Sequence, residues 1–295
     1  MAAPTLARPA EVQIVDGLNV AARPSPHRNT ALRASEFHDP RDGRIFHMTS
    51  GRYKRTGHSS PRHRHTFDQI RFVVEGRVKY GPLRHEGGDV AYFPAGTFYG
   101  PQELLSDEIL NCTIQTQGPT WGPFYTQDDL FTATEALSTL GEMDRATGQF
   151  VWNDGHQQDS FEAILEHTTG APVDYPEPRY HYPIQLRSRN FDWVTSRTPG
   201  VSLKPLATFN AGGPGVQLLK VERGATLPSG SPENQHILML ASGKLRRDGE
   251  TLGQGTYIYC PPGSTRPALA AEEETLLLAA EFQVRGKLLA RSLDC

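Results

Sequence analysis

The sequence predicts a mainly β protein made of two tandem antiparallel barrels or jelly rolls. One observation is a repeat: Gly57, Gly76, Gly88, Pro94 and Gly96 each recur as the same residue type 167 positions later. The other is composition, because 28 Gly and 23 Pro in 295 residues punctuate short strand-like segments. Five recurrences at one offset, without an insertion, indicate a duplicated domain.

The repeated segments also predict the individual strands. IRFVVEGRVKYG (70–81) and ILMLASGKLRRDG (237–249) are typical of two strands around a turn glycine. GDVAYFPAG (88–96) and GTYIYCPPG (255–263) are typical of a strand that ends at a proline, which cannot donate to an interior ladder.

The repeat and the segments around it predict four regions. Residues 1–35 form an N-terminal extension, 36–125 the first barrel, 126–190 a partly helical linker and 191–295 the second barrel. In the linker, TQDDLFTATEALSTLGEMDRATGQF (126–150) has apolar residues near helical spacing after a capping-type start, which predicts a helix over 126–145. The Pro-rich APVDYPEPRYHYP (171–183) predicts an extended segment over 170–185.

Two motifs in the first half carry a family resemblance. The stretch GHSSPRHRHTFDQIRFVVEG (57–76) has Gly, five residues and His-x-His, and ends in Gly. The stretch GDVAYFPAGTFYGPQE (88–103) has Gly, five residues and Pro-x-Gly. This pattern resembles the bicupins, which are tandem cupin β-barrels (double-stranded β-helix or jelly roll). Three positions depart from the cupin motifs, with Gln69 in the place of Glu, Tyr99 in that of His and Glu103 in that of Asn.

Within the cupins, PRHRHTFDQIRFVVEG (61–76) is similar to the first motif of gentisate-type aromatic ring-cleaving dioxygenases. That resemblance implies Fe(II) held by three histidines. His63 and His65 supply two of them, and Tyr99 stands where the third belongs.

Residue chemistry is consistent with a divalent transition metal at His63 and His65. Alternation along a strand puts both rings on one face, and imidazole suits Fe, Mn, Ni, Cu and Zn, with Fe(II) favoured by the resemblance. Gln69 offers a carbonyl oxygen as a third ligand, or a hydrogen bond to a ligand or water. Tyr99 is either a ligand or catalytic hydroxyl, or part of the pocket wall. The opposing interpretation is two strand histidines that bind no ion.

Other histidines and one arginine extend this site. His47, His58 and His85 are candidates for the missing third histidine, or ordinary loop and strand residues. Arg71 shares the face of Gln69, two positions earlier, and is predicted to hold a substrate carboxylate. The alternative is a salt bridge from Arg71 to a strand neighbour such as Glu75 or Glu86. Seven aromatic residues are candidates for the pocket wall or barrel core: Tyr92, Phe93, Phe98, Tyr99, Trp121, Phe124 and Tyr125.

The second barrel lacks this constellation. At the 167 offset, Gly230 and Pro232 replace the histidine pair, His236 replaces Gln69, and Arg266 replaces Tyr99. We therefore expect a structural role for this barrel.

Composition excludes several classes. A net charge of −3 without a basic stripe argues against nucleic acid as a partner. Cys112, Cys260 and Cys295 have no framework spacing, and no signal peptide or 18-residue apolar run is found, so we expect no membrane association and a cytoplasmic location. A homodimer is expected from the resemblance to the cupins.

The leading hypothesis is a metal-dependent enzyme acting on a small aromatic or carboxylated substrate in the first barrel. Its oxidative form is an Fe(II) dioxygenase, and its non-oxidative form is an isomerase, cyclase or lyase in which Tyr99 moves a proton. The alternative, from another class, is a non-catalytic small-molecule-binding or sensor bicupin.

Overall fold

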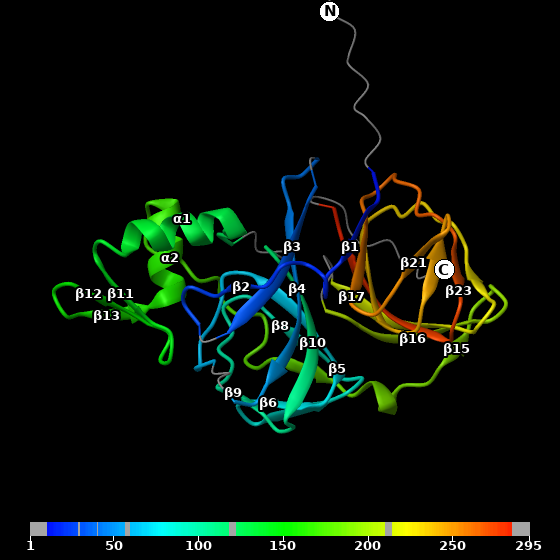
Figure 1. Ribbon diagram of the computed structural model, residues 1–295, viewed down its shortest axis with the longest axis horizontal. Coiled ribbons are helices and arrows are strands. Elements are labelled where there is room, and N and C mark those ends of the chain that lie inside the picture. Colours follow the sequence, from blue (N-terminus) through cyan, green and yellow to red (C-terminus); the bar gives the residue numbers. More distant parts are fainter. Residues whose placement is uncertain are drawn as a thin grey trace, which may run out of the picture. The chain divides into compact units, whose positions relative to one another are not determined.

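Short segments rich in β-branched and aromatic residues form strands in both halves of the chain. A computed structural model describes residues 11–28, 30–39, 41–56, 60–117, 122–209 and 214–284. The chain divides into an N-terminal unit, residues 17–191, and a C-terminal unit, residues 192–295 together with 1–16 (Figure 1). Four residues named in the predictions above lie outside the described residues: Gly57, His58, Trp121 and Cys295.

The N-terminal unit has a seven-stranded sheet of order β14-β8-β5-β10-β4-β3-β2 and a three-stranded sheet of order β7-β6-β9 (Figure 1). The strands are β2 (Arg23–Pro24), β3 (Ala31–His38), β4 (Ile45–Lys54), β5 (Asp68–Glu75), β6 (Arg77–Tyr80), β7 (Leu83–Glu86), β8 (Val90–Phe93), β9 (Gln102–Leu104), β10 (Glu108–Thr116) and β14 (Ile184–Leu186). Val73 and Phe93 from the large sheet share one apolar core with Val78 and Leu104 from the small sheet. The two sheets therefore pack face to face.

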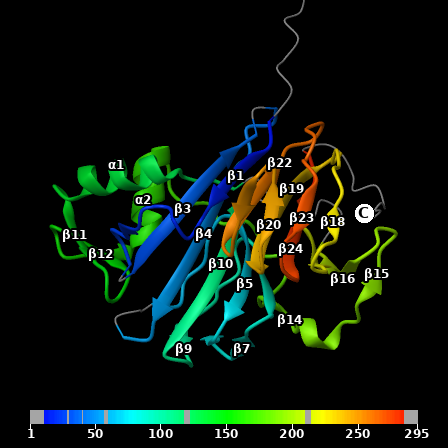
Figure 2. The ribbon, with the colours of Figure 1, turned by 45° about the vertical axis from the view of Figure 1, so that its right-hand side comes forward.

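The C-terminal unit repeats this plan, with one sheet of order β1-β22-β19-β24-β17-β16-β15 and another of order β18-β23-β20-β21 (Figure 2). Its strands are β1 (Gln13–Asp16), β15 (Val194–Thr195), β16 (Val201–Thr208), β17 (Gly215–Val221), β18 (Thr226–Leu227), β19 (Gln235–Ser242), β20 (Leu245–Arg247), β21 (Glu250–Leu252), β22 (Thr256–Cys260), β23 (Leu269–Ala271) and β24 (Thr275–Phe282). Its core is filled by leucine, isoleucine, valine and alanine from both sheets.

The two units correspond strand by strand at the offset found in the sequence. β5 and β19 lie 167 positions apart at both ends, as do β9 and β23. The isolated bridge between His63 and Tyr99 recurs between Gly230 and Arg266. Gly76 and its counterpart Gly243 both have a φ of 85°, in the left-handed region that favours glycine.

An α/β insert occupies much of the predicted linker. It comprises α1 (Gln127–Leu137), β11 (Gly141–Asp144), β12 (Gln149–Trp152), β13 (Gln157–Asp159) and α2 (Ser160–Thr169), which lie together at one side of the N-terminal unit (Figures 1 and 2). A capping box between Thr126 and Asp129 starts α1 where predicted. The predicted helix over 126–145 is too long, because the chain turns after Leu137 and enters a hairpin at Gly141. Residues 171–183 form neither helix nor strand, and the 3₁₀ turn Ser188–Asn190 follows β14.

The predicted N-terminal extension contributes strands to both units. β1, which lies in this extension, pairs with β22 at the edge of the C-terminal sheet. At the equivalent edge of the N-terminal sheet, the outer strand comes from the predicted linker, because β14 pairs there with β8. Each of these edges is thus covered by a strand from outside the repeat, which hides its free backbone groups. β3 begins at Ala31, before the expected barrel start at residue 36, because it pairs with β4.

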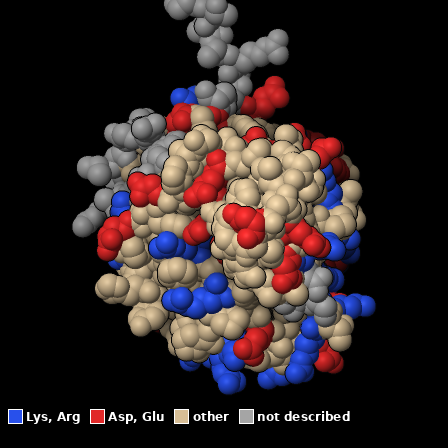
Figure 3. Space-filling model, turned by 90° about the vertical axis from the view of Figure 1, so that its left-hand side faces the viewer, with Lys and Arg blue, Asp and Glu red and all other residues tan. Residues whose placement is uncertain are grey.

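The described surface and helices add two observations. Acidic and basic side chains are interspersed on the face shown in Figure 3. Neither described helix has the length and hydropathy needed to cross a bilayer.

Candidate functional site

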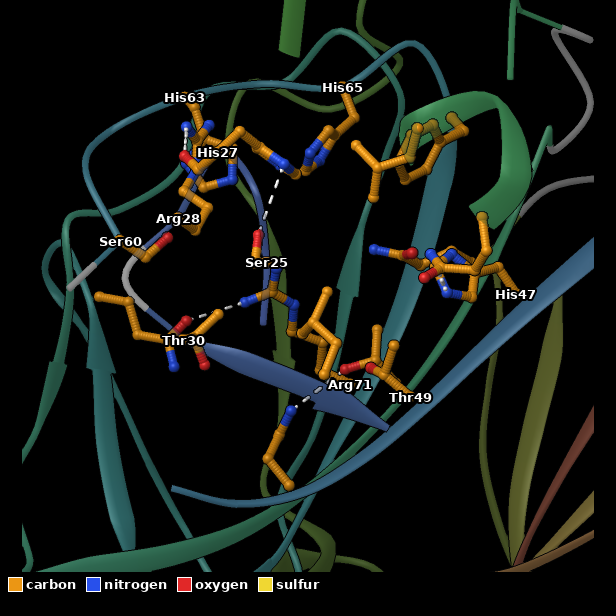
Figure 4. A pocket seen from close by; sticks show the side chains of 18 of the residues that line it. Ser25, His27, Arg28, Thr30, His47, Thr49, Ser60, His63, His65 and Arg71 are labelled. Carbon is orange, nitrogen blue, oxygen red and sulfur yellow. Dashed lines mark hydrogen bonds between the residues drawn. The ribbon is translucent and has the colours of Figure 1, made fainter. Parts of the chain in front are cut away.

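A cavity of about 150 Å³ lies in the N-terminal unit, and most of the residues that line it carry a polar side chain. Strands β4, β5 and β10, the segment before β3 and the start of α1 all contribute to the wall. Figure 4 shows His27, Arg28 and His63 close together, with His65 beside them and His47 farther away. None of the described residues that line this cavity is Asp or Glu. The cavity therefore presents donors and positive charge.

The sequence prediction that His63 and His65 face one space agrees with this geometry. Both rings line the cavity, with centroids 4.9 Å apart and planes at 82°. The bridge to Tyr99 fixes the backbone of His63, and the His63 Nδ1 lies 2.6 Å from the Pro61 carbonyl oxygen. That ring nitrogen therefore carries the proton, and Nε2 keeps its lone pair. Burial, reinforced by Arg28, lowers the pKa of His63 to about 3.

Arg71 determines which way the Gln69 amide points. The Arg71 Nη2 lies 2.9 Å and its Nε 3.3 Å from Gln69 Oε1, and Gln115 donates to the same oxygen at 3.2 Å. A guanidinium can only donate, so the oxygen end of the amide faces Arg71. The Gln69 Nε2 then lies 2.7 Å from His65 Nδ1 and 2.9 Å from the Tyr99 hydroxyl.

The charge of Arg71 has no carboxylate partner among the described residues. Its guanidinium carbon lies 4.7–5.0 Å from the ring centres of Tyr80, Phe93 and Tyr99, at cation–π distance. Its hydrogen-bond acceptors are neutral: the Gln69 and Gln102 amide oxygens and the Tyr99 hydroxyl.

The alternative prediction of a salt bridge from Arg71 to Glu75 or Glu86 is wrong. Glu75 pairs with Arg52 at 2.8 Å, and Glu86 pairs with Arg189. Both pairs lie on the exposed surface, so Arg71 keeps its charge available to the cavity.

Tyr99 lies behind the cavity wall. It is 5 % exposed and does not line the cavity. Its hydroxyl accepts from Gln69 and Arg71, and lies 3.0 Å from His65 Nδ1. Burial raises the pKa of this phenol, opposed by the charge of Arg71. Tyr99 therefore supports the side chains that face the cavity.

Sequence reasoning missed His27 and Arg28, which come from the predicted extension. Both are buried and line the cavity. Arg28 Nη1 donates to the His27 and Gly148 carbonyl oxygens at 3.0 and 3.1 Å. Arg28 Nη2 lies 3.7 Å from an Asp159 carboxylate oxygen and has no hydrogen-bond partner among the described residues. This segment has no periodic pattern, so the sequence offered no signal for either residue.

As arranged, the donor set does not fit a divalent metal. No three His, Cys, Asp or Glu side chains of the described residues are grouped closely enough to hold one. Gln69 Oε1 is engaged by Arg71 and Gln115. Gln69 Nε2 lies at hydrogen-bond distance, 2.7 Å, from His65 Nδ1, so the amide turns its NH₂ group, which has no lone pair for a metal, toward the histidine.

The candidates for a third histidine do not complete the set. His47 lines the cavity but meets Gln127 at 3.1 Å, His85 does not line it, and His58 lies outside the described residues. Metal ligation by His63, His65 and Gln69 stays a prediction.

The C-terminal unit shows that the fold does not require these polar groups. Arg71 pairs with Ala91 on β8, and at the equivalent register Leu238 pairs with Ile258 on β22. At the 167 offset, Gln102 corresponds to Leu269 and His85 to Leu252. These C-terminal counterparts belong to one hydrocarbon core.

Comparison with known proteins finds one matching family model and several solved structures of similar fold. Residues 183–285 match the ChrR cupin-like domain family. A candidate dioxygenase from Nostoc punctiforme is 17 % identical with a TM-score of 0.60, covering 97 % of this chain and 90 % of that chain. Oxalate decarboxylase from Bacillus subtilis is 14 % identical with a TM-score of 0.54, covering 93 % and 77 %.

Protein YlbA from E. coli is 9 % identical with a TM-score of 0.54, covering 97 % of both chains. The search of curated proteins gave no match. At such identities the likeness concerns the fold alone. The chain is thus a mainly β protein with the fold of these structures, and residues 183–285 carry the sequence pattern of a cupin-like domain.

Proposed function

We propose that the chain is a bicupin whose N-terminal barrel binds a small organic carboxylate. The observation that carries this proposal is Arg71, a partly buried guanidinium that lines the cavity. It has no carboxylate partner in the described part of the chain, and the C-terminal unit has Leu238 at this position. A partly buried charge is unfavourable without a partner, and the C-terminal unit folds without one at this position. The planar guanidinium of arginine suits a carboxylate as that partner.

The rest of the cavity supports an anionic ligand. Arg28 adds a second, buried guanidinium, one nitrogen of which has no hydrogen-bond acceptor among the residues that the structure describes. No Asp or Glu is found among the described lining residues, and although Arg28 lies 3.7 Å from Asp159 outside that lining, Arg71 has no carboxylate partner among the described residues. A cavity of about 150 Å³ suits a molecule the size of benzene. A benzoate-sized acid or a small dicarboxylate fits these limits, and the name oxalate decarboxylase gives one such acid for a structural neighbour.

Calorimetric titration tests the proposal. Benzoate, hydroxybenzoates and oxalate are the ligands, and benzamide is the uncharged control. We expect at least one carboxylate to bind and benzamide not to bind. Arg71→Met should weaken binding by more than about 30-fold, whereas Arg84→Met, at an exposed position of β7, should leave it unchanged. Equal binding of benzamide, or of carboxylates by Arg71→Met, would refute the proposal.

The second candidate function is the metal-dependent enzyme, as an Fe(II) dioxygenase or a non-oxidative isomerase, cyclase or lyase. It is favoured by His63, whose Nδ1 is held by a backbone carbonyl while Nε2 keeps its lone pair, as in many metal-binding histidines. The Mn(II) centres named for the neighbouring oxalate decarboxylase also favour it. Stoichiometric transition metal in the purified protein, lost in His63→Ala, would support this candidate, and oxygen-uptake assays with hydroxybenzoates would then separate its oxidative form. Substoichiometric metal that does not change in His63→Ala supports the carboxylate-binding protein.

A further inference from the structure

We infer that Gln69 makes the cavity selective for anions, because its amide forces His65 to present a hydrogen-bond donor to the ligand. This inference rests on the proposed function and names the residue that sets its ligand class. The evidence is a chain of hydrogen bonds from Arg71 through Gln69 to His65.

The first step is the orientation of the Gln69 amide. Because three donor nitrogens from Arg71 and Gln115 surround Oε1, the amide cannot turn its NH₂ group toward them. The two amide hydrogens therefore point the other way, to His65 Nδ1 at 2.7 Å and to the Tyr99 hydroxyl at 2.9 Å.

The second step is the tautomer of His65. Its Nδ1 faces the Gln69 amide hydrogen and, at 3.0 Å, the Tyr99 hydroxyl, which accepts from Gln69 and Arg71 and has only its own hydrogen to offer. A neutral His65 therefore carries its single proton on Nε2. Gln69 and Tyr99 do not line the cavity and His65 does, so the ring turns Nδ1 toward the wall and leaves Nε2–H for a ligand. An anion accepts from that hydrogen.

The third step is the effect on a cation. A metal ion needs the Nε2 lone pair, so the proton would have to move to Nδ1. There it would meet the Gln69 amide hydrogen at 2.7 Å, donor against donor. The positive charge of Arg71 opposes the cation further, since its guanidinium holds the same amide.

Gln69→Glu should reverse the direction of the hydrogen bond to His65, because a carboxylate has two acceptor oxygens and no donor. It would accept from Arg71 with one oxygen and from His65 Nδ1–H with the other. His65 would then present a lone pair at Nε2, and the added charge would offset Arg71. Gln69→Met is the control, since it removes the amide without adding an acceptor or a charge.

Nitrogen-15 NMR of the full-length protein reads the tautomer directly, with the His65 signal assigned by its loss in His65→Gln. We expect Nε2–H in the wild type and Nδ1–H in Gln69→Glu. Titration should show carboxylate affinity falling more than about tenfold and Zn²⁺ affinity rising at least about tenfold in Gln69→Glu. Gln69→Met should lose carboxylate affinity without gaining affinity for Zn²⁺.

Two results would overturn the inference: an Nδ1–H tautomer in the wild type, or a folded Gln69→Glu protein that binds Zn²⁺ no better than wild type. Failure of the proposed function looks different, because the wild type would bind no carboxylate while His65 still showed Nε2–H. Thermal unfolding of each variant reports whether it is folded.

Discussion

At the scale of single residues, Arg71 and Leu238 show how the interior of the N-terminal unit differs from that of the C-terminal unit. They occupy the same register in the two units, beside Ala91 and Ile258 respectively. A charge held among aromatic rings and amides contributes less to stability than hydrocarbon packing of similar volume. Arg71 is therefore better explained by a ligand than by the fold.

Arg71→Leu should abolish carboxylate binding without destabilising the protein. The substitution installs the residue that the C-terminal unit uses, so we expect the free energy of unfolding to be unchanged or to rise by about 1 kcal/mol. The reverse change, Leu238→Arg, buries an unpaired charge in a hydrocarbon core and should cost more than about 3 kcal/mol. Urea denaturation and calorimetric titration measure both effects. A large loss of stability in Arg71→Leu would show that the arginine serves the fold.

Part of the site follows from spacing alone and part does not. His63 and His65, or Gln69 and Arg71, share a face because side chains alternate along an extended chain. The 167-residue offset also shows from the sequence alone that the counterpart of Arg71 in the second half is a leucine, Leu238. His27 lies in a segment without periodicity, and only the folded chain brings it to the cavity. The direction of the Gln69 amide depends on hydrogen bonds from two other residues, which spacing does not encode.

At the scale of elements, glycine spacing predicted strand positions well, and the linker was predicted poorly. Gly76 and Gly88 mark turns because both have positive φ, a conformation that side chains disfavour. The helix over 126–145 was overextended because the apolar spacing continues past Leu137 into a β-hairpin. A hairpin and a helix share apolar residues at several spacings, so periodicity does not separate them over so short a segment.

Gly96 allows the segment 171–183 to approach the turn that follows β8. A Cβ at Gly96 would collide with the Pro176 carbonyl oxygen, while a Cβ at its counterpart Gly263 would meet no atom of the described residues within 4 Å. Both glycines have nearly the same φ, 78° and 76°. Ala at either position therefore carries the same backbone strain of about 1–2 kcal/mol. We expect Gly96→Ala to lose further stability and to expose 171–183 to limited proteolysis, whereas Gly263→Ala shows the strain alone. Equal losses would contradict a role for this close approach.

The start of α1 joins the insert to the cavity. Thr126 accepts from the Asp129 backbone and begins the helix, and the adjacent Tyr125 and Gln127 line the cavity. Thr126→Ala should lower the free energy of unfolding by about 1 kcal/mol. It should also weaken carboxylate binding, because the cap no longer fixes the neighbouring residues that line the cavity. Thr139→Ala, beyond the far end of the same helix, should leave binding unchanged. Denaturation and calorimetric titration of both variants check this. Equal carboxylate affinity in the two variants would show that the helix cap does not affect binding in the cavity.

At the scale of the whole molecule, buried ionisable groups predict how stability depends on pH. Burial lowers the pKa of His85 to about 4, assisted by Arg71 and Arg187. The unfolded chain binds this proton near pH 6.5, so His85 lowers stability progressively as the pH falls from about 6.5 toward 4. Asp68 acts in the opposite direction, since burial raises its pKa to about 6 and it costs stability as the pH rises from about 4 to 6.

His85→Leu separates these contributions. Both ring nitrogens of His85 lack hydrogen-bond partners among the described residues, and the C-terminal unit has the buried Leu252 at the same offset. We expect His85→Leu to stabilise the protein by about 1–2 kcal/mol at pH 5, with a smaller gain at pH 7.5. His181→Gln, at an exposed position, is the control for the loss of a surface histidine. Urea denaturation at both pH values measures the difference. Identical pH dependence in His85→Leu and wild type would mean that His85 titrates normally in the folded protein.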